Sequence, residues 1–285
     1  MPRFKLTIEY AGTRYSGWQI QKNAKTIQGE IHRAVGTVTA RKDFELYGSG
    51  RTDAGVHALA QVAHLDVSTP LSPEILRGRL NDELPADINI LAAEVVPHRF
   101  HARHDAVARR YLYQIARRRT AFAKAYVWWV KEPLAIDRMR EAARSFVGMK
   151  DFESFAEGPG SPTRRPRRGG DSARGPREAP GSPTRRPRCS TFVFVDRLDI
   201  AEEGDLMLVA IEGSHFLWKM VRRIVGVLVE IGRGGLEPAA AARFLAESSA
   251  APAGLTAPSS GLFLERVYYQ DDPRTVATAA VTPLR

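Results

Sequence analysis

One short run of the chain combines the residue types that chemistry at a sugar carbon needs. It reads Gly48-Ser49-Gly50-Arg51-Thr52-Asp53-Ala54-Gly55-Val56-His57-Ala58. Because glycine adopts positive φ without a steric penalty, the run predicts a sharply bent loop after a strand, with Asp53 presented from it. A short carboxylate held in this way suits nucleophilic or acid–base chemistry. The alternative is an ordinary turn in which Asp53 accepts backbone hydrogen bonds and Arg51 is a surface charge.

A carboxylate that acts as a nucleophile must be ionised, so a cation is expected nearby. Arg222 is the candidate, because it lies in a strongly apolar helical stretch where a charge is buried only with a partner. Its neighbour Arg223 projects about 100° away around the helix, and the alternative is that both side chains reach out to solvent. Similarly, Tyr111 and Tyr113 fall on one face of a predicted strand, and the residues alone do not say which of them is core.

Apolar spacing predicts that strands and helices alternate in both halves of the chain, which indicates an α+β fold. The expected strands are Phe4–Tyr10, Phe44–Gly48, Val62–Val67, Ile88–Val95, Ala108–Ile115, Phe192–Ile200, Leu206–Glu212 and Leu262–Tyr269. The expected helices are Thr26–Val38, Pro73–Glu83, Arg138–Val147, Phe216–Ile231 and Pro238–Glu247. Ser72-Pro73 is a helix-start signal, Asp137 is expected to cap the third helix and Gly148 to stop it. A boundary is expected near Ala102–Val107, dividing an N-terminal subdomain (1–105) from a C-terminal one (106–285).

The chain is basic, with a formal net charge of +10 and a pI near 10, which favours a polyanionic partner such as nucleic acid. Much of this charge lies between Glu157 and Ser190, where nine arginines face three acids. Gly160–Arg167 is repeated there as Gly181–Arg188, and a proline-rich charged segment of this kind is predicted to be a disordered insertion at about 157–190. Two interpretations stay open: an arm that grips RNA, or a duplicated insertion of little consequence.

The sequence also excludes several kinds of structural feature. A single cysteine, Cys189, allows neither an intramolecular disulfide nor a cysteine-cluster zinc site. No apolar run approaches the ~20 residues of a membrane-spanning helix. The alternating N-terminal residues Phe4–Tyr10 predict a strand rather than a signal peptide, so a cytoplasmic location is expected.

The Asp53 run resembles the signature of tRNA pseudouridine synthases of the TruA type, whose Gly-x-Gly-Arg-Thr-Asp-Ala-Gly-Val-His-Ala pattern matches Gly48–Ala58. Further runs match that family in the same order and together span nearly the whole chain outside the Arg/Pro-rich insertion. They are Tyr10–Gln19, Thr26–Glu30, Asn81–Ile88, Phe100–Arg103, Arg109–Tyr113, Phe216–Gly226 and Thr256–Leu262.

The resemblance implies isomerisation of uridine to pseudouridine at positions 38, 39 and 40 of the tRNA anticodon stem-loop, with the target base flipped out. It implies that Asp53 is the nucleophile, Arg222 its ion-pair partner and Tyr111 the ring stacked on the uracil. Leu262 would close the base pocket. No cofactor is needed, because nothing is oxidised.

Two further residues would contact the RNA around the base pocket. Arg51 would bind phosphate or fill the gap left by the flipped nucleotide. His57 would act likewise, unless it is a packing histidine.

The same resemblance implies two ferredoxin-like α/β halves whose antiparallel sheets meet around a central basic cleft, and a homodimer that binds one tRNA. The chain departs from the family pattern at Ala11, Lys150 and His215 and at the insertion, none of which removes Asp53, Tyr111 or Arg222. Two rival interpretations are a non-catalytic RNA-binding protein and an isomerase for ribosomal RNA or another tRNA position. A glycosidase is disfavoured, because its hydrolysis usually needs a second carboxylate.

Overall fold

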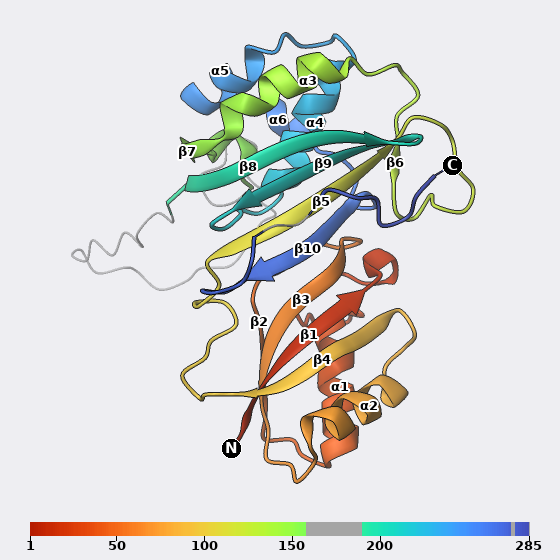
Figure 1. Cartoon of the computed structure of the whole chain (residues 1–285), viewed down its shortest axis with the longest axis vertical. Helices are drawn as coiled ribbons and strands as arrows, with labels where there is room; N and C mark the ends of the chain where they lie inside the picture. Colours follow the sequence, from red (N-terminus) through yellow and green to blue (C-terminus); the bar gives the residue numbers. More distant parts are fainter. Residues whose placement is uncertain (158–189, 275–276, 285) are drawn as a thin grey trace, which may run out of the picture.

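The computed structural model of the chain describes residues 1–157, 190–274 and 277–284 (Figure 1). The predicted disordered insertion lies almost wholly outside the described residues. Ten strands form one sheet, in which β4, β1, β3, β10, β5, β9, β8 and β7 follow one another, β2 pairs with β3, and β6 pairs with β5. Nearly all pairings are antiparallel, so the expected α+β class is confirmed. Within the described residues, no helix has the length and apolar character that crossing a membrane requires.

The N-terminal half is a βαββαβ unit. Its elements are β1 (Arg3–Tyr10), α1 (Ile27–Thr39), β2 (Glu45–Gly48), β3 (His57–Asp66), α2 (Pro73–Glu83) and β4 (Ile88–Val96). The strands lie in the order β4-β1-β3-β2, which is the ferredoxin-like arrangement. Apolar residues of α1 and α2 pack against one face of these strands in a single buried cluster. Thr26 and Ser72 cap the two helices by accepting hydrogen bonds from Gly29 N and Ile75 N.

The C-terminal half repeats the same order of strands. Its principal elements are β5 (Ala108–Ala116), α3 (Ile136–Ala143), β8 (Phe192–Glu203), β9 (Leu206–Gly213), α4 (Met220–Gly232) and β10 (Leu262–Tyr268). These strands lie in the order β10-β5-β9-β8. The half is completed by β6 (Trp128–Trp129), β7 (Gly148–Asp151), α5 (Ala240–Ala246) and α6 (Ala251–Gly254). The helices of this half cover one face of its strands, as Figure 1 shows.

The two halves join where β3 lies beside β10. This is a parallel contact of two residue pairs, Phe263 with His57 and Leu264 with Ala58. Because β10 comes from the far end of the chain, its Leu264 and Val267 pack into the core of the N-terminal half. The subdomain boundary at residue 105 stays a prediction.

Three expectations about helix ends were wrong. The third helix begins two residues earlier than expected, and its N-cap is Ala135, without a side-chain cap, so Asp137 lies in its first turn instead. It ends at Ala143 in a 3-10 turn rather than at Gly148, which begins β7 with a φ of +94°. The fourth helix begins at Met220 instead of Phe216, because Lys219 adopts the left-handed conformation that precedes it. In the sheet, β3 begins at His57, earlier than the apolar run from Val62 indicated.

The buried histidine His64 on β3 predicts a pH-dependent stability. Its Nδ1 accepts a hydrogen bond from Ala102 N, and burial together with the charge of Arg3 lowers its pKa from 6.5 to about 4. The unfolded chain therefore binds a proton between those two values that the folded chain does not, so stability falls as the pH drops from 6.5 to 4. We expect a loss of about 2–3 kcal/mol in the free energy of unfolding.

Urea unfolding at pH 7 and pH 4.5 measures this loss. In His64→Asn, whose amide oxygen still accepts from Ala102, the difference between the two pH values should shrink by most of that amount. An unchanged difference would show that other groups carry the pH dependence.

Candidate active site

The loop that carries Asp53 joins β2 to β3 and is fixed along its length. Ser49 Oγ donates to Gln61 Oε1 at 2.6 Å, and Tyr10 Oη and Thr52 Oγ1 share a hydrogen bond of 2.8 Å. Trp18 N donates to Thr52 O at 3.1 Å, so the backbone next to Asp53 is held by an aromatic core residue. Buried side chains and strand backbone therefore set where the carboxylate points.

Glycine is required at two points around this loop. Gly55 has a φ of +78°, which places it in the left-handed region. Gly17 also has a positive φ, and a Cβ there would stand 2.5 Å from Thr52 O. The prediction of a sharply bent loop is thus confirmed, although one of its glycines, Gly50, has open space where a Cβ would be.

Arg222 reaches Asp53 from the opposite half of the sheet. It extends from the first turn of α4, with its Nη1 3.4 Å from Asp53 Oδ2, and its Nε donates to Ala257 O at 2.7 Å. The two side chains are 16% and 23% exposed, so the ion pair is half sheltered from water and still accessible. The guanidinium therefore holds the Asp53 carboxylate in a fixed place between the two halves.

The alternative that Arg222 and Arg223 both reach out to solvent is wrong. Arg223 is 2% exposed and donates to Ala156 O at 2.5 Å, and its Nη2 lies 3.4 Å from Glu157 Oε2. The two arginines therefore point to different partners, and of the two only Arg222 reaches Asp53.

Tyr111 lies on β5 where the two halves meet. Its ring packs against the cores of both halves and meets Phe216 edge-on, at 5.1 Å between ring centres. Burial raises the pKa of its hydroxyl to about 12, and the charge of Asp53 acts in the same direction. The hydroxyl is therefore protonated at neutral pH, so it can donate a proton or a hydrogen bond.

Tyr113, on the same strand face, is fully buried and donates from its hydroxyl to Pro258 O at 2.8 Å. Leu262, its neighbour across the strands, is also buried and belongs to the same core. The structure thus makes Tyr113 a core residue and leaves Tyr111 partly accessible.

Arg51 and His57 differ in their surroundings. Arg51 is exposed two residues before Asp53, where RNA could reach it. His57 is 1% exposed, its Nδ1 accepts from Gly12 N at 3.1 Å, and its Nε2–H donates to Ala125 O at 3.1 Å. Its ring also stacks on Phe263 at 4.8 Å, and burial lowers its pKa. The structure therefore does not bring His57 to an RNA-facing position; its geometry is that of a packing histidine.

A packing role predicts how the variant His57→Ala should behave. Losing two buried hydrogen bonds and the ring contact should lower the free energy of unfolding by about 2–4 kcal/mol. The affinity for an RNA substrate, measured on the folded fraction by filter binding, should change by less than about threefold. If the variant instead had wild-type stability but weakened RNA binding, His57 would be a substrate-binding residue.

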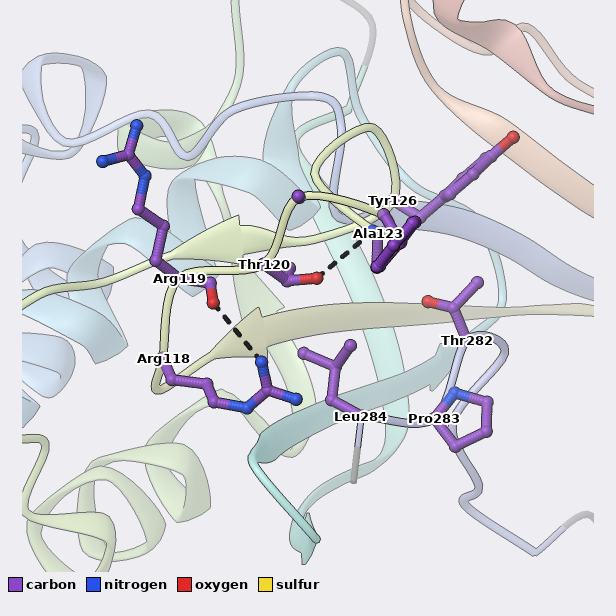
Figure 2. A pocket seen from close by; sticks show the side chains of 10 residues that line it. Arg118, Arg119, Thr120, Ala123, Tyr126, Thr282, Pro283 and Leu284 are labelled. Carbon is purple, nitrogen blue, oxygen red and sulfur yellow. Dashed lines mark hydrogen bonds between the residues drawn. The ribbon is translucent and has the colours of Figure 1, made fainter.

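One hollow in the structure lies away from these residues (Figure 2). It has a volume of about 520 Å³ and is lined by residues 118–123, Tyr126 and Thr282–Leu284. These residues belong to the face of the C-terminal half opposite its helices, and none of Asp53, Tyr111 or Arg222 lines it. This hollow is therefore separate from the candidate site.

Sequence reasoning missed some residues that shape the site. The carbonyl of Ala257, which holds Arg222, and the ring of Phe216, which holds Tyr111, were inside matched runs but had no assigned role. Arg109 was missed in the same way, although its position two residues before Tyr111 on a strand puts both on one face.

Comparison with known proteins agrees with this geometry. A family model described as tRNA pseudouridine synthase matches residues 6–105 and 182–270. The chain is 39% identical over 273 residues to tRNA pseudouridine synthase A of Rhodopseudomonas palustris (strain BisA53), covering 95% of this chain and 100% of that protein. It is 34% identical over 269 residues to tRNA pseudouridine synthase A 2 of Clostridium tetani, covering 93% and 98%. The chain therefore belongs to the tRNA pseudouridine synthase family, whose members are isomerases that act on tRNA uridine.

Proposed function

We propose that this protein converts uridine to pseudouridine at positions 38, 39 and 40 of the tRNA anticodon stem-loop, with Asp53 as the nucleophile. The observation that carries the proposal is the half-sheltered pair of Asp53 and Arg222, 3.4 Å apart, next to the partly accessible ring of Tyr111. Family membership supplies the reaction class. The three tRNA positions rest on the resemblance of the sequence motifs.

The reaction needs groups that this site provides. The bond from ribose C1′ to N1 of uracil breaks, the base turns while it stays bound, and C5 forms the new bond to C1′. The proton on C5 is then lost and N1 gains one, so the product is an isomer of the substrate. Asp53 would act on the sugar, by attack at C1′ or by starting an elimination through C2′. Arg222 would hold its carboxylate in position through their ion pair.

The detached base must be retained while it turns. Tyr111 offers a flat wall for stacking, and its protonated hydroxyl is available for a proton relay. Leu262 would close the other side of the pocket. Because a stacked nucleotide cannot reach Asp53 inside a helix, the target uridine must be flipped out, and the exposed Arg51 is placed to occupy the gap or bind the adjoining phosphate.

Assembly as a homodimer and a cytoplasmic location complete the proposal. The dimer rests on the motif resemblance, and the location on the tRNA substrate that family membership implies. Light scattering of the purified protein with and without tRNA tests whether it is a homodimer.

Pseudouridine mapping at single-nucleotide resolution tests the function. The substrate is an unmodified tRNA with uridines at 38, 39 and 40, and the control is the same tRNA with cytidine at those positions and uridines elsewhere. Conversion confined to 38–40 supports the proposal. Conversion only at other positions, or only of a ribosomal RNA fragment, would assign a different RNA substrate, while tight binding without conversion would favour a binding protein.

A further inference from the structure

Arg109 contacts the backbone of several segments around the candidate site at once. It lies on β5, two residues before Tyr111 and on the same face of the strand. Its Nη1 donates to Ala106 O at 3.0 Å and to Ser214 O at 2.8 Å. Its Nη2 donates to Ser49 O at 3.2 Å and to Arg103 O at 2.9 Å. A single guanidinium thus binds carbonyls from three separate stretches of backbone.

Two of these carbonyls begin the segments that carry the site. Ser49 opens the loop that carries Asp53, and Ser214 opens the segment that leads through Phe216 to Arg222 at the start of α4. Tyr111 lies between the two segments, with its ring against Phe216. Arg109 therefore links the backbone on either side of Tyr111, although none of its hydrogen bonds reaches Asp53 itself.

Among the described residues, Arg109 has no acidic partner within 4.0 Å, and burial lowers its pKa. A half-buried cation bound only to carbonyls is costly to desolvate, so stability alone would not favour it over an apolar residue. Only a guanidinium offers a rigid fork with enough N–H groups for four acceptors.

We propose that Arg109 is a positioning residue that holds the Ser49 and Ser214 segments at a fixed separation, so that Asp53 and Phe216 stand on either side of Tyr111 before RNA binds. It acts through the backbone and does not touch the substrate. The expected effect of Arg109 on the reaction rate rests on the proposed function. Its expected effect on the loops rests on the hydrogen bonds alone.

The test variant is Arg109→Lys, which keeps the charge but offers a single nitrogen. We expect kcat for uridine conversion at saturating tRNA to fall about 10- to 100-fold, because small misplacements of reacting groups have effects of that size. The dissociation constant for tRNA should stay within about threefold of wild type. Amide exchange of residues 49–56 and 214–219 should speed up by about tenfold or more, while that of α2 is unchanged.

Arg110→Lys is the matched control. Arg110 is the next residue on β5, fully buried on the opposite face, and its Nε lies 2.6 Å from Glu265 Oε2. This variant should lose stability without selectively loosening the two site segments. Arg109→Ala should regain part of its lost kcat when guanidinium is added at non-denaturing concentration, and Asp53→Asn should not.

The outcomes separate this inference from the proposed function. If exchange in 49–56 and 214–219 does not change in Arg109→Lys, the linkage is wrong whatever the activity. If exchange rises but kcat is unchanged, or if only tRNA affinity falls, Arg109 is not a positioning residue. A wild-type protein that converts no uridine would overturn the proposed function, and the exchange measurement would still decide whether Arg109 fixes the loops.

Discussion

Replacing Asp53 by Asn should abolish uridine conversion, with kcat lowered roughly 10³-fold or more, because the amide has no charge with which to act on the sugar. The loop should keep its conformation, since its hydrogen bonds run through Ser49, Thr52 and Gln61 rather than through the Asp53 side chain. The measurement is single-turnover conversion of an unmodified tRNA, with tRNA affinity measured in parallel.

Two controls sharpen this prediction. Asp53→Glu keeps the charge but moves it by one methylene, and it should also be inactive because the loop holds the backbone in place. Asp43→Asn, an exposed acid just before β2, should behave as wild type. Equal conversion by the wild type and by Asp53→Asn would show that another group is the nucleophile.

Replacing Arg222 by Met should lower kcat about 10²- to 10³-fold, because Asp53 loses the guanidinium 3.4 Å away that orients its carboxylate. Methionine is expected to preserve the helix, since α4 is otherwise apolar around this position. Arg222→Lys should be intermediate, because one ammonium cannot bind both Asp53 and Ala257 O as the guanidinium does.

Arg233→Met is the matched control for the two Arg222 variants. Arg233 lies just past the other end of α4 and pairs with Glu132 and Glu230 near the surface. Its loss should leave kcat within about twofold of wild type, because exposed ion pairs contribute little. If both arginine variants lost activity in proportion to their stability, Arg222 would be a structural residue only.

The sequence predicted the structure best where a local property, such as helix capping or a glycine at positive φ, decides the conformation. Ser72-Pro73 predicted the start of α2 because capping is a local property. The Gly-rich run predicted the bent Asp53 loop for the same reason, since Gly55 must have positive φ wherever the loop lies.

Prediction failed where long-range contacts decide. Nothing local marks Lys219 for a left-handed conformation, so the start of α4 was placed too early. The separate environments of Tyr111 and Tyr113 depend on contacts with Phe216, in the segment before α4, and with Pro258, in the segment before β10. Strand alternation cannot distinguish the two tyrosines. The packing of His57 could not be predicted either, because its two hydrogen-bond partners, Gly12 and Ala125, are remote in sequence.

The position of β10 has a consequence for how the protein is made. The strand ends at Tyr268, near the end of the chain, yet it lies in the middle of the sheet between β3 and β5. Until β10 emerges from the ribosome, the edge of β5 that it covers is open, and so is the end of β3 at His57 and Ala58. Open strand edges are sites for unwanted strand pairing, and the last strand closes both of them. Truncation before Leu262 should therefore yield an aggregation-prone fragment rather than a partly active enzyme.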